Sequence, residues 1–165
     1  MERNDSLLIS TSYFWSNILN TFVFGHDPMT ITLADVYMLT GLRITGSMQP
    51  YDFLSAGSKK LAKISDCTGW ASHILNHIGD GSTVAEREHV AFLNIWFKRF
   101  IFCGSSCRPT VNHKYLAERL AVGNEIPLGK YLLQFAYHLM HQVAVQLLKN
   151  EPVHAISGPW WLIQL

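Results

Sequence analysis

The segment from Leu128 to Lys149 constrains the fold most, because its apolar residues keep helical spacing over about five turns. A helix with one continuous apolar stripe must bury that stripe against other elements. Asn150 and Pro152 follow the segment and end it, since proline cannot continue a helix. The sequence therefore predicts a long packed helix here. Its apolar positions are Leu128, Leu132, Phe135, Leu139, Val143 and Leu147.

A second long helix is predicted over 84–102. Thr83 and Glu86 have the spacing of a capping box, in which each residue satisfies a free amide of the other. From Val90 onward the segment is apolar on nearly all sides, so we expect it to be central. Shorter helices are predicted over 70–78 and 113–122.

A short strand–helix–strand module is predicted near residues 29–46. The β-branched residues 30–32 favour an extended segment. Thr32 and Asp35 then resemble a capping box, and Gly41 is well placed to end the helix in a left-handed conformation. We expect Leu33, Val36 and Leu39 to anchor this helix and residues 42–46 to form the second strand. The fold class is therefore mainly α, as an irregular helical domain.

The remaining segments carry weaker patterns. Residues 7–24 show partly helical spacing that ends before Pro28, and residues 47–83 form a weakly patterned connecting region. We predict one domain over 1–165. Pro159 starts an apolar helix in which the chain stops, so we expect the complete domain to continue past Leu165.

Composition excludes several classes of protein. Apolar residues make up 48% of the chain and charged residues 15%. The net charge of +1 gives no electrostatic argument for nucleic-acid binding. Three cysteines fit a reducing compartment better than a secreted disulfide framework. We find no signal peptide and no apolar run of the roughly 18 residues that a membrane span requires.

Cys103, Cys107 and His113 are the strongest candidates for chemistry, as zinc ligands or as a cysteine nucleophile with a base. The Cys-x-x-x-Cys spacing is not that of a zinc finger. The segment CGSSCR (103–108) also lacks the five residues that a cysteine phosphatase places between its cysteine and arginine. The alternative is an ordinary loop after a helix, and we assign no catalytic, cofactor-binding or metal-binding residue.

Histidines and tryptophans give three further candidates. His73 and His77 lie four residues apart on a predicted helix, with Cys67 upstream, which is a spacing that zinc ligands use. His138 and His141 lie on the long helix, where they either line a polar groove or bond to neighbouring loops. Trp160 and Trp161 are either core residues or a surface for a partner.

Three segments together resemble the plant mobile domain, also called the aminotransferase-like plant mobile domain. They are PMTITLADVYMLTGLRITG (28–46), IPLGKYLLQFAYHLMHQVAVQLL (126–148) and ISGPWWLIQL (156–165). The resemblance runs from about Phe22 to Leu165 and is loose over 50–85.

The resemblance implies a mainly α-helical plant domain that occurs in nuclear proteins and in transposable-element genes. Members similar to the MAINTENANCE OF MERISTEMS proteins act in meristem maintenance, transposon silencing and gene expression, together with a protein phosphatase 7-like partner. Pyridoxal phosphate chemistry needs a Schiff-base lysine and a partner for the pyridinium nitrogen, and we identify neither. We therefore expect a nuclear, non-catalytic interaction domain without cofactors. The alternatives are a zinc- or cysteine-dependent enzyme-like domain and a nucleic-acid-binding module.

Overall fold

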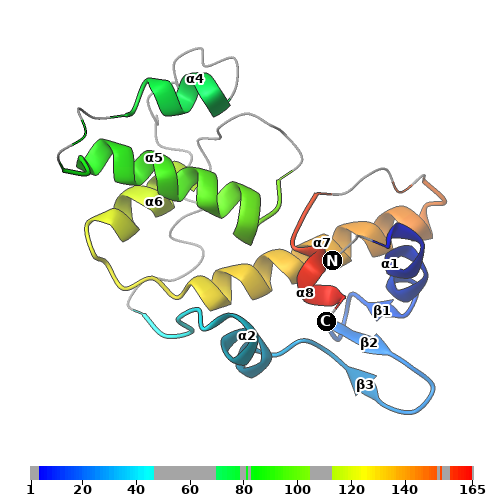
Figure 1. The fold of residues 1–165 in the computed structure, drawn as a ribbon. Coiled ribbons are helices and arrows are strands. Elements are labelled where there is room, and N and C mark those ends of the chain that lie inside the picture. The colour runs from blue at the N-terminus through cyan, green and yellow to red at the C-terminus, as the bar shows by residue number, and fades with distance from the viewer. Residues whose placement is uncertain are drawn as a thin grey trace. The chain divides into compact units, whose positions relative to one another are not determined.

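The structure is a computed structural model that describes residues 4–46, 70–78, 81, 83–104, 113–151, 153 and 157–164. The predicted mainly α class is confirmed, since helices dominate the described residues and the strands form one small sheet (Figure 1). The chain divides into two compact units. Unit 1 combines residues 1–44 with 128–165, and unit 2 contains residues 45–127. Most of the predicted connecting region, residues 47–69, lies outside the described residues.

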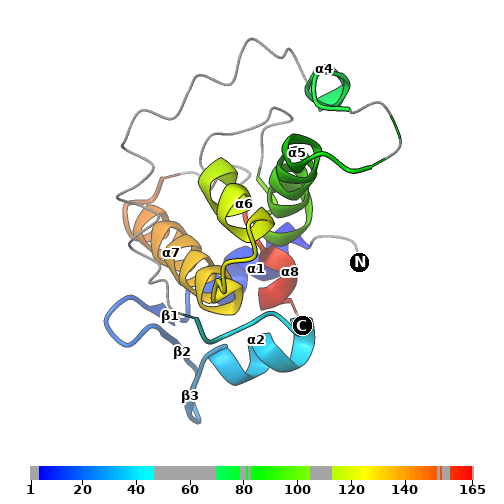
Figure 2. The ribbon, with the colours of Figure 1, turned by 90° about the vertical axis from the view of Figure 1, so that its left-hand side faces the viewer.

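Unit 1 is built around α7 (Leu128–Leu148), which confirms the long helix predicted from the apolar spacing. Four other elements of the unit pack on it: α1 (Asp5–Ser12), β1 (Trp15–Ser16), α2 (Leu33–Thr40) and α8 (Trp160–Ile163) (Figure 2). One hydrophobic cluster joins α1, β1 and α8 to α7. Its buried members are Leu8, Trp15, Phe22, Leu139, Met140, Val143, Ala144 and Trp160.

The helix predicted from the spacing over 7–24 forms only as far as Ser12, and the rest of that prediction is wrong. Only α1 is helical, and the chain then forms an antiparallel sheet of β1, β2 (Thr21–Val23) and β3 (Pro28–Met29). Trp15 pairs with Phe22 across the first two strands, and their rings meet edge to face at 4.9 Å. Asn20 adopts a left-handed φ of 53° in the turn that reverses the chain.

The predicted caps of α2 are confirmed. The Thr32 hydroxyl accepts from the Asp35 amide at 3.3 Å, and the Asp35 carboxylate accepts from the Thr32 amide at 2.8 Å and from its hydroxyl at 2.7 Å. These bonds from the Thr32 hydroxyl and amide lower the pKa of Asp35. Gly41 ends the helix with φ +66°.

The second strand of the predicted module does not form, because residues 42–46 pair with no strand of the described chain. Instead, the Arg43 carbonyl accepts a hydrogen bond at 2.8 Å from the Gly129 amide, a donor in the first turn of α7 without an intrahelical partner. The first strand is β3, which pairs with β2. Leu39 was also wrongly predicted as an anchor, since it lies on the exposed side of α2.

Unit 2 contains α4 (Trp70–Leu75), α5 (Glu86–Trp96), the π-helical turn η1 (Phe97–Ile101) and α6 (Lys114–Ala121). The predicted capping box at Thr83 is wrong, because α5 begins after Ala85 without a side-chain cap. We expected this helix to be central because it is apolar on nearly all sides, but Phe92 and Phe100 are exposed, so part of its apolar surface is not buried. Within η1 itself, Phe97 and Ile101 are buried and Phe100 is exposed.

Candidate functional site

Exposed apolar side chains on α2 are the first candidate for a functional surface. Val36 is fully buried against the rest of unit 1, whereas the next three residues, Tyr37, Met38 and Leu39, are exposed, Met38 by 82%. Consecutive helical residues point about 100° apart, so four apolar residues in a row cannot share one buried face. Helix α2 therefore presents an apolar side to its surroundings.

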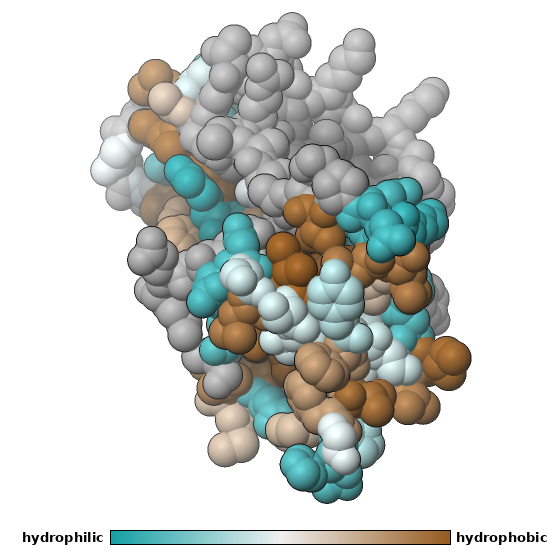
Figure 3. Space-filling model, turned by 90° about the vertical axis from the view of Figure 1, so that its right-hand side faces the viewer, coloured by the Kyte–Doolittle hydropathy of each residue, from teal (hydrophilic) through white to brown (hydrophobic). Residues whose placement is uncertain are grey.

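The sheet of unit 1 adds further apolar exposure. Ile18 and Leu19, in the connection between β1 and β2, are exposed, Ile18 by 91%. Val23 on β2 and Met29 on β3 are also exposed, while their neighbour Phe22 is buried. Figure 3 shows brown, apolar side chains over much of one face, with teal, polar residues between them. We call the seven residues Ile18, Leu19, Val23, Met29, Tyr37, Met38 and Leu39 the exposed apolar set.

A hydrogen-bond network on α7 fixes the segment between β3 and α2. The Tyr137 hydroxyl donates to the Ile31 carbonyl at 2.6 Å and accepts from the Thr30 hydroxyl at 3.0 Å. The Thr30 hydroxyl also lies 2.9 Å from the Asn20 carbonyl, in the turn of the sheet. Tyr137 on α7 thus holds the segment that joins β3 to α2, and both of these elements carry residues of the exposed apolar set.

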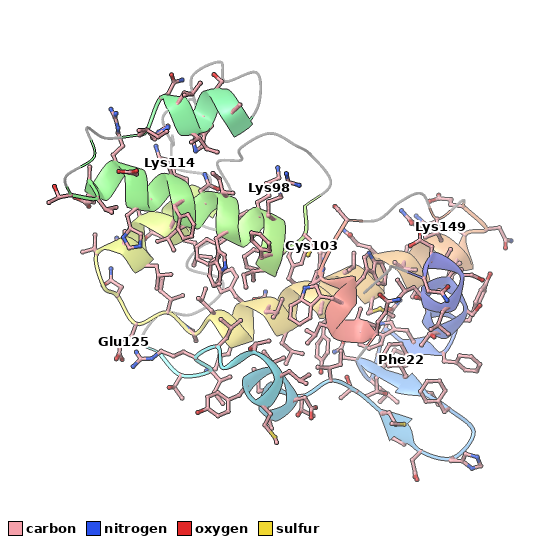
Figure 4. All side chains as sticks on the ribbon, viewed as in Figure 1. Phe22, Lys98, Cys103, Lys114, Glu125 and Lys149 are labelled. Atoms are coloured by element: carbon pink, nitrogen blue, oxygen red, sulfur yellow. The ribbon has the colours of Figure 1, made fainter. Side chains whose placement is uncertain are left out.

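The cysteine–histidine candidates lie in unit 2, where Cys103 and His113 are described and Cys107 is not. Cys103 follows η1 with a left-handed φ of 46°, and its thiol faces the Arg99 carbonyl at 3.7 Å (Figure 4). The neighbouring Phe102 ring stacks on His113 at 4.7 Å. Burial, and then the positive charge of Lys98, lower the pKa of His113 to about 4, so this ring is neutral at pH 7.

The second histidine candidate is a close pair in unit 2. The rings of His73 and His77 lie 4.3 Å apart, and His77 Nδ1 lies 2.7 Å from the His73 carbonyl. Burial, then His77 and Lys114, lower the pKa of His73. The upstream Cys67 lies outside the described residues. Within the described part of the chain, no three His, Cys, Asp or Glu residues gather as a metal site would require.

The remaining candidates have clear positions in unit 1. Trp160 is buried in the core cluster, whereas Trp161 is partly buried, so the two tryptophans have different environments. His138 and His141 are exposed, and the Gln142 amide lies 3.0 Å from His138 Nε2. None of the residues of the exposed apolar set was predicted from the sequence to form a binding surface. The run Val36–Leu39 was the available signal, because it is too continuous for one face of a short helix.

The similarity of this chain to known proteins and protein families identifies the family to which it belongs. No curated protein and no solved structure is a significant match to this chain. Among the described residues, no helix has both the length and the apolar content that crossing a bilayer requires. The sequence model of the plant mobile domain matches residues 1–165, which is the full chain. The predicted resemblance is thereby confirmed, and the chain belongs to the plant mobile domain family.

Proposed function

We propose that this chain is a non-catalytic protein-interaction domain of a nuclear, transposon-related plant protein. Family membership supports this proposal at the level of the domain. The observation that carries it is the exposed apolar set on α2 and the sheet of unit 1. The biological role that we propose is the one implied by the family: meristem maintenance, transposon silencing and gene expression.

The composition of the exposed apolar set suits a protein partner. Burying apolar surface contributes about 25 cal/mol per Å² removed from water, so side chains as exposed as Met38 and Ile18 have much to gain from contact. Tyrosine and methionine are also enriched in protein interfaces, where charged residues are depleted. We expect Tyr37 and Met38 to supply most of the binding energy on α2.

A protein phosphatase 7-like protein is the partner that we propose, on the basis of the family alone. The test is an affinity pull-down of that phosphatase with the tagged full chain and two variants, Met38→Glu and Ile18→Glu. Each places a charge on a side chain that is more than about four-fifths exposed, so both variants should fold. Leu148→Glu is the matched control, since Leu148 is the last residue of α7, is 79% exposed and is not in the exposed apolar set.

We expect the parent chain and Leu148→Glu to recover the phosphatase and the two other variants to lose at least about tenfold in binding, as a charge in a desolvated contact does. Circular dichroism of each variant verifies the fold. Equal recovery by all four proteins would show that the exposed apolar set is not the docking surface. No recovery by the folded parent chain would remove the proposed partner.

A further inference from the structure

The charges around the exposed apolar set have one sign. All members of the set lie within residues 4–42, a stretch that contains Asp5, Asp27 and Asp35 but no glutamate, lysine or arginine. All three aspartates are exposed. With His26 counted as neutral, the stretch has a formal charge of −3, whereas the net charge of the whole chain is +1. We call residues 4–42 the acidic segment.

Asp35 borders the apolar side of α2. It lies in the first turn of the helix, three and four residues before Met38 and Leu39. Residues at these spacings are neighbours on one side of a helix, so the carboxylate lies beside two members of the exposed apolar set. The hydrogen bonds from Thr32 lower the pKa of Asp35, so this carboxylate is charged at neutral pH.

Asp27 borders the part of the set that lies on the sheet. It directly precedes β3, in which Met29 belongs to the exposed apolar set. Pro28, the first residue of β3, pairs with Val23 of the set across the antiparallel ladder. Each of the two parts of the set, on α2 and on the sheet, therefore has an exposed carboxylate at its border.

The basic residues nearest to α2 in the chain and on α7 lie at the opposite end of that helix from Asp35. Arg43 follows the C-terminal end of α2, where its carbonyl accepts from the Gly129 amide, and Lys130 is the next residue of α7. Lys149 directly follows the last residue of α7. The acidic charge beside the apolar side of α2 is therefore not offset within its own part of the chain.

The following inference rests on the proposed function and specifies the chemistry of the partner. We propose that the exposed apolar set docks a basic amphipathic segment of another protein, whose lysine or arginine side chains lie opposite Asp27 and Asp35. Complementary charges steer a partner to a surface and reject partners of the same sign. The carboxylates repel nucleic acids and anionic membranes. A second copy of this chain, docked through the same face, would bring the aspartates of both copies together.

The test measures the binding of three fluorescent peptides to the full chain by stopped-flow mixing. Each peptide has about 18 residues, or about five helical turns, with leucines on one side and lysine, glutamine or glutamate at the other positions. We expect the lysine peptide to bind at least about tenfold more tightly than the glutamate peptide at an ionic strength of about 0.01 M, where the Debye length is about 30 Å. The difference should shrink at about 1 M, where the Debye length is about 3 Å.

The acidic and the apolar residues should affect different rate constants. Asp27→Asn should lower the association rate constant of the lysine peptide by about twofold at low salt, and Asp27→Lys should lower it further. Met38→Gln leaves the charge unchanged and should raise the dissociation rate constant by about tenfold, because it removes an apolar contact. Glu151→Gln is the matched control and should bind like the parent, since Glu151 is an exposed carboxylate of unit 1 outside the acidic segment. Circular dichroism verifies the fold of each variant.

The possible results separate this inference from the proposed function. Equal binding of the three peptides that weakens in Met38→Gln would overturn the basic partner and leave the apolar docking surface in place. Equal effects of Asp27→Asn and Glu151→Gln would also overturn the basic partner. Binding that Met38→Gln leaves unchanged would overturn both proposals. A dimer of the parent chain that Met38→Gln abolishes would assign the surface to a second copy. If no peptide binds the folded chain, the inference fails, and the phosphatase pull-down decides separately on the proposed function.

Discussion

Replacing Tyr137 by phenylalanine tests whether one hydroxyl on α7 holds the sheet and α2 in place. The Tyr137 hydroxyl donates to the Ile31 carbonyl at 2.6 Å and accepts from the Thr30 hydroxyl at 3.0 Å. Phenylalanine keeps the ring, whose centroid lies 5.5 Å from that of Trp15. The variant therefore removes two polar contacts and leaves the aromatic packing unchanged.

The two contacts are not equal in free energy. The Thr30 hydroxyl has one proton, and it can donate to the Asn20 carbonyl at 2.9 Å after the Tyr137 oxygen is removed. The Ile31 carbonyl loses its donor in a part-buried position, where water replaces the bond only incompletely. One lost hydrogen bond with an underbonded acceptor costs about 1.5 kcal/mol in the free energy of unfolding. For a chain of this size, that corresponds to a fall in Tm of about 3–6 °C.

Urea unfolding followed by tryptophan fluorescence measures this change, because Trp15 reports on the same part of unit 1. Tyr13→Phe is the control, since Tyr13 is 69% exposed. Thr30→Val adds a second test. Combined with Tyr137→Phe, it should cost less than the sum of the two single variants, because the side chains share one network.

A change in the free energy of unfolding for Tyr137→Phe within about 0.3 kcal/mol of that for Tyr13→Phe would contradict this prediction. The network would then contribute no net stability, and packing alone would position the segment that leads into α2. Strict additivity of Thr30→Val and Tyr137→Phe would lead to the same conclusion.

Three further predictions concern two glycines and the partly buried His113. Gly41→Val should lower the free energy of unfolding by more than about 1 kcal/mol, because φ is +66° at that position. Gly25→Val is the control and should change the melting temperature little, because no atom lies near its added side chain. Equal melting temperatures of the two variants would contradict the prediction. Gly158→Ala should cost about 1–3 kcal/mol in denaturant unfolding, since its Cβ would collide with the buried Leu139 side chain, and an unchanged midpoint would show that Leu139 can move aside. The pKa of His113 is lowered from 6.5 to about 4 in the folded protein, so between these pH values the folded state binds fewer protons at His113 than the unfolded state does. The contribution of His113 to stability is therefore complete above pH 6.5 and is lost as the pH falls towards 4. His113→Phe keeps the stacking on Phe102 and should flatten stability between those pH values, whereas an equal slope in both proteins would assign the dependence to other groups.

Local sequence signals predicted α2 and α7 well. The two reciprocal bonds between Thr32 and Asp35 span only three residues, and Gly41 accepts a left-handed φ without help from distant contacts. In α7, the apolar stripe predicted the limits of the helix and most of its buried face. Phe135 was wrongly placed on that face, since it is 36% exposed. The candidate surface was less accessible to prediction, because the exposure of Met38 depends on which side of α2 packs on α7.

The family, the mainly α class and the helices whose caps and periodicity lie within a few residues of one another could all be predicted from the sequence. The conformation of 13–29 depends on tertiary contacts such as the Trp15–Phe22 pair, which outweigh helical spacing. The tertiary structure also decided that Trp160 joins the core and that burial keeps His113 neutral. Burial is a property of contacts between distant segments, so a residue's neighbours in sequence do not specify it.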